Sequence, residues 1–279
     1  MDIFSVLFYQ PVYNLLILFY RLFGENLGIA IILVGILTRV VILPFSLKQM
    51  KFADESKKMN EEIKLIRKKY KDQKEKMQEE LLKVQSKYLP GQLSGCLPLI
   101  LQFIFLINIY NVINDIINKG VESFNKIAYS FVGKFPEAYV LNNDFFGIVD
   151  LTKSYSSVSN STQSTEIIGY LILVFLVGVT QYLSIKLSTN NTKSNLYNDK
   201  NDETKDQKLK NETFNNKEEN DDLKIAMQKT QSQLVVLFPI MIVLISLSFP
   251  TGLVLYWIVQ NVFVIIQYSF KTLFLKKLN

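Results

Sequence analysis

The 279-residue sequence contains no histidine and only one cysteine, Cys96. Histidine is the commonest acid–base catalyst and metal ligand, and a single cysteine can form neither an internal disulfide nor a multi-cysteine zinc site. These absences exclude most enzyme classes, so we expect neither enzymatic activity nor a cofactor. Cys96 opens an apolar run, where a free cysteine is expected to act as a small buried hydrophobe.

Nucleotide-binding signatures are also missing, because no phosphate-binding loop or dinucleotide fingerprint occurs in the chain. The longest polar stretch, residues 189–222, is rich in Asn, Lys, Asp and Glu and has few bulky apolar residues. Such a composition buries too little surface to fold alone, and we expect a disordered insert there. Its charges nearly cancel, so we expect no nucleic-acid recognition from it.

The hydrophobic residues make up 49% of the chain and are gathered into long runs between polar stretches. A helix needs about 20 apolar residues to cross about 30 Å of hydrocarbon. We therefore expect an all-α membrane protein with five transmembrane helices. The expected spans are residues 28–47, 97–117, 167–187, 234–249 and 253–270.

The first 26 residues are apolar but are interrupted by polar side chains, including Gln10, Asn14 and Arg21. This pattern predicts an amphipathic helix at the membrane interface over residues 1–26, with a sixth span as the alternative. The segment has no basic amino-terminal region and no small-residue cleavage site, so it does not resemble a cleaved signal peptide.

Residues 48–93 show helical periodicity, because apolar residues recur twice at steps of four, three and four. The two sets are Met59, Ile63, Ile66 and Tyr70, followed by Met77, Leu81, Val84 and Tyr88. Matching seams predict a helical hairpin with charged outer faces. The pattern fits a solvated helical pair and equally a basic arm that contacts anionic lipid, ribosome or nascent chain, and the two interpretations are compatible.

Lysine and arginine are crowded in the hairpin and scattered among acids in the connection at 118–166. Basic residues near the ends of spans tend to stay in the cytoplasm. This bias places the hairpin, the loop at 188–233 and the tail at 271–279 in the cytoplasm. The connection and the amino terminus are then expected on the outer side.

Arg39 lies well inside the first expected span and is the most informative residue of the chain. A charged side chain at this depth costs several kcal/mol unless it faces protein, water or a counter-charge. The expected spans contain no acidic residue except Asp115 near one end. Gly35 and Ser46 share a helix face with Arg39, and small residues there would leave room for a cavity. We therefore expect Arg39 in a hydrated polar cavity.

Other expected spans carry polar side chains that could line the same cavity: Gln102, Gln181, Trp257 and Asn261. For each amide the alternative is a helix-to-helix hydrogen bond, which is worth on the order of 1 kcal/mol in membrane proteins. A buried arginine costs much more, so a functional role is favoured for Arg39 above the others.

Three segments together resemble the signature spans of the YidC/Oxa/Alb family of membrane protein insertases. They are Arg39 followed by Pro44, GCLPLILQFIFLINIY at 95–110 and PTGLVLYWIVQN at 250–261. The chain looks like the short, Gram-positive-like form of the family. The resemblance implies a hydrophilic groove that is open to the cytoplasm and to lipid. It matches Arg39 to the groove arginine and Gln181 and Trp257 to other groove-lining positions.

The resemblance implies an insertase and chaperone of the bacterial plasma membrane that acts on nascent membrane proteins. A polar or acidic outer segment of the substrate would enter the groove, drawn by Arg39, while its apolar span moves into the lipid bilayer. The ribosome and the Sec translocon are the further partners that it suggests. The alternatives are a transporter or channel for an anionic solute, and a membrane assembly scaffold. Access to Arg39 from one side only would favour the insertase.

Overall fold

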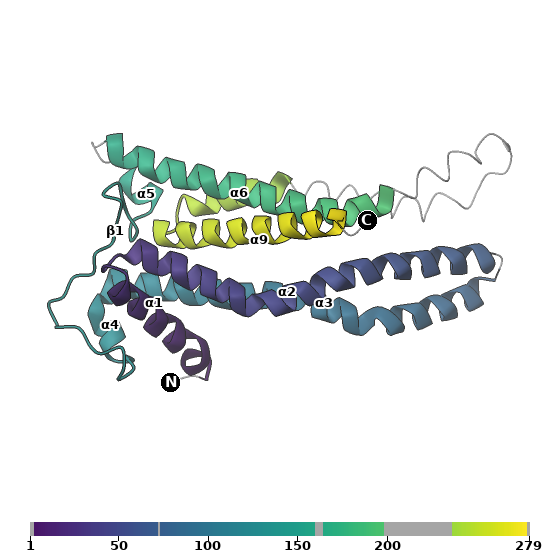
Figure 1. Ribbon diagram of the computed structural model, residues 1–279, viewed down its shortest axis with the longest axis horizontal. Coiled ribbons are helices and arrows are strands. Elements are labelled where there is room, and N and C mark those ends of the chain that lie inside the picture. The colour runs from purple at the N-terminus through teal and green to yellow at the C-terminus, as the bar shows by residue number, and fades with distance from the viewer. Residues whose placement is uncertain (1–2, 72, 160–163, 198–235, 278–279) are drawn as a thin grey trace.

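The computed structural model describes residues 3–71, 73–159, 164–197 and 236–277. Long helices run side by side along the long axis of the molecule (Figure 1). Within the described ranges, four helices are long and apolar enough to cross a membrane. The expected all-α membrane fold is therefore confirmed. The candidate spans are Leu27–Lys48, Ile100–Lys119, Ile167–Ser188 and Thr251–Phe270.

The region of the remaining expected span, 234–249, contains a shorter apolar helix, Val236–Ser246. A crossing of the membrane there stays a prediction, because residues 198–235 lie outside the described part of the chain. Most of the expected insert at 189–222 also lies outside the described residues, so its expected disorder stays a prediction.

Helices α2 (Leu27–Lys69) and α3 (Lys74–Lys119) have 43 and 46 residues, and each is therefore about 65–70 Å long. Both continue from a candidate span into the hairpin, so the hairpin extends two spans and is not a separate helical pair (Figure 1). Pro44 lies inside α2, where a proline removes a backbone hydrogen bond and favours a kink. The two halves of α2 run in different directions in Figure 1. Cys96 lies in α3, but its side chain is outside the described residues.

The two arms of the hairpin meet along the apolar seam expected from the sequence, where the seam side chains are buried or half-buried. A polar contact also joins the arms. The Lys87 ammonium lies 2.8 Å from Glu62 Oε1, and the Tyr88 hydroxyl donates a hydrogen bond to the same oxygen at 3.0 Å. Glu62 belongs to α2 and its partners belong to α3, so the contact fixes how the arms align.

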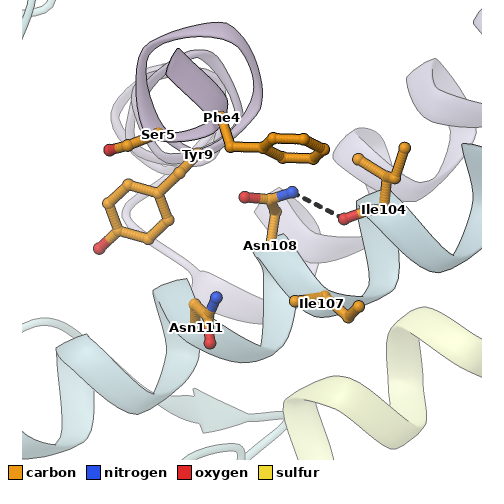
Figure 2. Close-up of a pocket in the computed structure, with 7 residues that line it drawn as sticks. All are labelled: Phe4, Ser5, Tyr9, Ile104, Ile107, Asn108 and Asn111. Atoms are coloured by element: carbon orange, nitrogen blue, oxygen red, sulfur yellow. Dashed lines mark hydrogen bonds between the residues drawn. The ribbon is translucent and has the colours of Figure 1, made fainter. Parts of the chain in front are cut away.

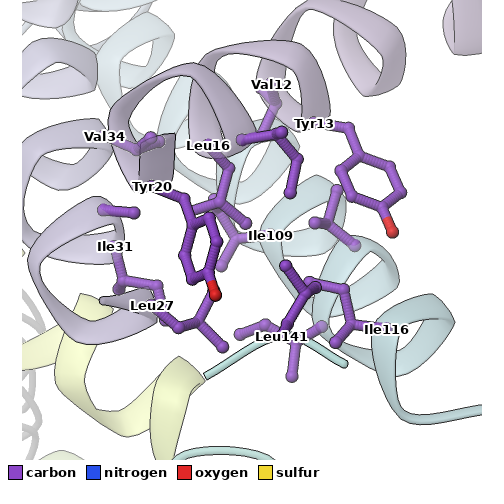
Figure 3. Packing of buried hydrophobic residues seen from close by; sticks show 14 of the residues in the cluster. Val12, Tyr13, Leu16, Tyr20, Leu27, Ile31, Val34, Ile109, Ile116 and Leu141 are labelled. Atoms are coloured by element: carbon purple, nitrogen blue, oxygen red, sulfur yellow. The ribbon is translucent and has the colours of Figure 1, made fainter. Parts of the chain in front are cut away.

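The amino-terminal segment consists of a short π-helix, η1 (Ser5–Tyr9), and helix α1 (Gln10–Leu22). Along α1, Val12, Tyr13, Leu16 and Tyr20 are buried in a cluster with residues of α2 and α3 (Figure 3). The amino-terminal segment also reaches along α3 into the depth of a candidate span. Phe4 and Ser5 lie beside Ile104 and Asn108 of α3, well inside a candidate span.

The structure describes most of the expected outer connection, 118–166, which holds α1 through hydrogen bonds. It contains α4 (Val121–Asn125), strands β1 (Asp144–Phe145) and β2 (Val149–Asp150), and α5 (Tyr155–Val158). The Asn14 side chain donates to Ile127 O at 3.0 Å and accepts from Tyr129 N–H at 2.7 Å. The Arg21 guanidinium donates to two carbonyl oxygens of the connection and lies 4.1 Å from the centre of the Phe135 ring.

Helices α6 (Ser164–Tyr197) and α9 (Thr251–Lys277) complete the described bundle, with α6 packed on α9 and α9 packed on α2. Helix α6 continues beyond the expected end at residue 187, so the start of the expected loop at 188–233 is helical. Helix α9 likewise continues into the expected tail at 271–279. Gly252 N–H donates to Leu151 O at 2.8 Å, and a Cβ at Gly252 would lie 3.1 Å from that oxygen. The absence of a side chain at Gly252 therefore lets the first turn of α9 pack closely against the connection.

Candidate functional site: a polar cavity among the helices

A cavity of about 300 Å³ lies among α2, α3, α6, α9 and the helix Val236–Ser246. We call it the polar cavity. All five side chains selected from the sequence line it: Arg39, Gln102, Gln181, Trp257 and Asn261. Four further polar residues do so as well: Ser46, Ser184, Ser188 and Gln267. No carboxylate occurs among the described lining residues. The structure thus brings the selected residues into one place.

Helical spacing explains why these residues converge. Gln181, Ser184 and Ser188 follow one another at steps of three and four along α6, so they share one face of the helix. On α9, Trp257 and Asn261 are four residues apart, and Val264 and Tyr268 extend the same face. Sequence reasoning missed Ser184 and Gln267, although the spacing of Ser184 from Gln181 was a usable signal.

Arg39 is almost fully buried, with 6% of its surface exposed. Its Nη2 donates a hydrogen bond of 3.3 Å to Gln102 Oε1, and its Nε is buried without a hydrogen-bond partner among the described residues. Asp115 does not neutralise it, because that carboxylate accepts from Tyr9 and forms an ion pair of 2.8 Å with Lys119. Within the described part of the chain, Arg39 has no ion-pair partner.

The amides of the polar cavity differ in their hydrogen bonding. Gln102 accepts from Arg39, and Asn261 Nδ2 donates to Thr180 Oγ1 at 3.3 Å, which joins α9 to α6. A helix-to-helix hydrogen bond, the alternative role for each amide, is therefore seen for Asn261 and for Gln102. Gln181 is 7% exposed, and its Oε1 is buried with no hydrogen-bond partner in the described structure.

A ladder of hydrogen bonds joins α2 to α9 beside the polar cavity. Gln260 Nε2 donates to Gly35 O at 2.9 Å and to Thr38 Oγ1 at 3.1 Å, and Gln267 Nε2 donates to Ser46 Oγ at 3.0 Å. The expected role of Gly35 is corrected here. A Cβ at this position would lie 2.9 Å from Val259 Cγ1, so the glycine permits close helix packing and does not enlarge the cavity.

The polar cavity is asymmetric along the bundle. Helices α2, α6 and α9 all run from the end near α4 toward the end of the hairpin (Figure 1). Ser46 and Ser188 lie seven residues beyond Arg39 and Gln181, so the polar lining extends toward the hairpin. On the other side of Arg39 the helices are joined by a buried apolar cluster. Its members include Ile31, Val34, Ile109, Ile113 and Leu253.

A second pocket of about 310 Å³ lies between the amino-terminal segment and α3 (Figure 2). Phe4, Ser5 and Tyr9 face Asn108 and Asn111 of α3 there, and Asn108 Nδ2 donates to Ile104 O within its own helix at 2.7 Å. None of the residues selected from the sequence lines this pocket.

Comparison with known proteins places the chain in a family. The family model described as "60Kd inner membrane protein" matches residues 18–277. The membrane protein insertase YidC of Fusobacterium nucleatum is 23% identical over 88% of this chain and 85% of its own length. The insertase MisCA of Bacillus subtilis is 24% identical over 92% of this chain and 74% of its own length.

The YidC protein of Syntrophobacter fumaroxidans is 25% identical over 92% of this chain, which spans only 36% of that relative. The match to the family model covers nearly the whole chain and includes every candidate span and the polar cavity. This protein therefore belongs to the 60Kd inner membrane protein family, the family of the YidC, Oxa and Alb proteins.

Proposed function

We propose that the protein is a membrane protein insertase that passes nascent proteins from the cytoplasm into the lipid bilayer through the polar cavity. The observation that carries the proposal is a buried cation, Arg39, without an ion-pair partner among the described residues, in a cavity lined by amides and serines. Two relatives that match this chain over most of their own length are named insertases, which supports the proposal.

The mechanism is physical transfer and involves no covalent step. A polar segment that crosses bare hydrocarbon loses its hydrogen bonds to water, which costs several kcal/mol for each unsatisfied group. The polar cavity supplies hydrogen-bonding groups to about the depth of Arg39, so the remaining apolar path is shorter. Arg39 attracts an acidic or polar outer segment, and the neighbouring apolar span leaves into lipid.

The proposed orientation has the hairpin, the loop at 188–233 and the carboxyl terminus in the cytoplasm and the amino terminus outside. The excess of lysine and arginine in the hairpin supports it. The polar cavity then opens toward the cytoplasm, and the apolar cluster around Ile31 and Ile113 closes the outer side. The basic hairpin is the proposed surface for the ribosome, the nascent chain or the Sec translocon.

A transporter or channel for an anionic solute is the second candidate, because Arg39 would attract an anion as well. Transport requires a path that reaches both sides of the membrane. The buried apolar cluster between Arg39 and the outer end argues against such a path. A scaffold that only holds other membrane proteins would leave the polar cavity and its buried charge without a role.

Complementation tests the proposal. The host's own insertase is depleted, and insertion of a single-span substrate with a short acidic outer tail is measured with the wild-type protein, Arg39→Ala or Arg39→Lys. We expect rescue by the wild type, loss with alanine and substantial rescue with lysine, because lysine keeps the positive charge. If the wild-type protein reaches the membrane but does not restore insertion, a transporter or a scaffold would be favoured over an insertase.

A further inference from the structure

Two side chains that line the polar cavity each carry a fully buried polar atom without a hydrogen-bond partner in the described part of the chain. These are the Nε–H of Arg39 and the Oε1 of Gln181, and neither has a partner among the described residues. Both side chains are more than nine-tenths buried and both line the polar cavity. A buried polar atom without a hydrogen bond is unfavourable, so this pair favours an occupant that both accepts and donates.

The two free atoms restrict the chemistry of the occupant. A carboxylate has acceptor atoms only, so it would satisfy Arg39 and leave Gln181 Oε1 unpaired. An ammonium group has donors only and would do the reverse. A peptide group carries one C=O acceptor and one N–H donor, which is the combination that the polar cavity lacks.

We infer that the polar cavity binds the backbone of the passing chain, with a peptide C=O accepting from Arg39 and a peptide N–H donating to Gln181. The inference rests on the proposed insertase function and names the part of the substrate that is recognised. Because every protein has the same backbone, this recognition serves tails that lack acidic side chains, whereas an acidic tail can place a carboxylate at Arg39 and then does not use Gln181.

The conformation of the bound segment follows from the same argument. The middle of an α-helix satisfies its own peptide groups, whereas an extended chain or a helix end leaves them free. The segment in the polar cavity is therefore an extended chain or a helix end and not the middle of a helix. A volume of about 300 Å³ is at the lower end of ordinary ligand pockets, so the segment is short.

The test compares two single-span substrates that differ only in the outer tail, which is acidic in one and made of Ser, Gly and Asn in the other. Initial insertion rates are measured in proteoliposomes that contain the full-length protein, normalised to the amount of folded protein. Gln181→Leu should slow the uncharged tail about five- to tenfold and the acidic tail less than about twofold. Arg39→Lys should support the acidic tail but not the uncharged one.

The matched control is Gln260→Leu, which removes another buried amide, one that does not line the polar cavity. It should lower thermal stability and leave the ratio of the two insertion rates unchanged. Gln181→Met keeps the length of the side chain and repeats the test if leucine packs badly. Equal rates for wild type and Gln181→Leu on the uncharged tail would mean that water alone fills the cavity, and would overturn the inference. If the wild type inserts neither substrate, the proposed function itself fails.

Discussion

At the scale of single residues, the buried polar side chains explain most of the candidate site. Arg39 and Gln181 could be selected from the sequence because polar groups are rare inside apolar spans and costly to bury. The role of Gly35 could not be predicted, because the sequence does not show that α9 packs against it. Gln267 was missed for a similar reason, since its partner Ser46 is distant in the sequence and only the fold brings them together.

Gly35→Ala should destabilise the protein by about 1–3 kcal/mol, because the added methyl group would meet Val259 at the contact between α2 and α9. Thermal unfolding in detergent micelles measures the effect. The double variant Gly35→Ala/Val259→Ala makes room for the methyl group and should recover part of the loss. No recovery in the double variant would show that this contact is not the cause.

Gln102→Glu should change stability and activity in opposite directions. A carboxylate at this position would pair with Arg39, whose present hydrogen bond to Gln102 is 3.3 Å long. The pair should raise the unfolding temperature and slow the insertion of acidic-tailed substrates, because the charge of Arg39 is then neutralised. Gln102→Leu is the control, since it removes the hydrogen bond without adding a charge and should lower stability. Faster insertion with Gln102→Glu would contradict the proposed role of Arg39.

At the scale of elements, the all-α membrane fold could be predicted from hydrophobic run lengths and helical periodicity, because both are local properties of the sequence. The connection was less predictable, since its strands have only two residues each and depend on contacts with α1 and α9. Asn14 and Arg21 interrupted an apolar segment in the sequence. The structure shows that these two side chains fasten α1 to the connection.

The alignment of the hairpin should depend on pH through Glu62. Hydrogen bonds from Lys87 and Tyr88 hold the pKa of the Glu62 carboxyl below its ordinary value, and the pKa of Lys87 is raised by the same contact. A lowered carboxyl pKa contributes stability above the unfolded-state pKa of about 4.3, and this contribution is lost as the pH falls through the folded-state value. The arms should therefore loosen as the pH falls below the unfolded-state pKa of a glutamate.

Spin labels on the exposed positions Leu65 and Leu82, introduced as cysteines in a Cys96→Ser background, measure the separation of the arms. The effect should be modest, because the contact is exposed to solvent. With Glu62→Gln the separation should no longer change in this pH range. An unchanged pH response in that variant would assign the titration to another group.

At the scale of the whole molecule, the polar cavity on one side of Arg39 and the apolar cluster on the other form the asymmetry on which the proposed function depends. The sequence predicted a polar cavity from one charge in one span. It could not show where the cavity ends, because the closing cluster combines residues of α1, α2, α3, α4 and α9.

Thiol labelling with a membrane-impermeant reagent tests this asymmetry most directly. Single cysteines replace Ser46, Ser184 or Ile113 in a Cys96→Ser background, and each variant is labelled in intact cells and in inverted membrane vesicles. Leu65→Cys in the hairpin and Val140→Cys in the connection, both exposed, report the two sides of the membrane.

The account predicts that the cysteines at 46 and 184 react from the side that labels the hairpin and not from the other. The cysteine at 113 should react from neither side, because it is buried in the apolar cluster. Labelling of position 184 from both sides would reveal a continuous path across the membrane. That result would contradict a cavity closed at its outer end and would favour transport of an anionic solute.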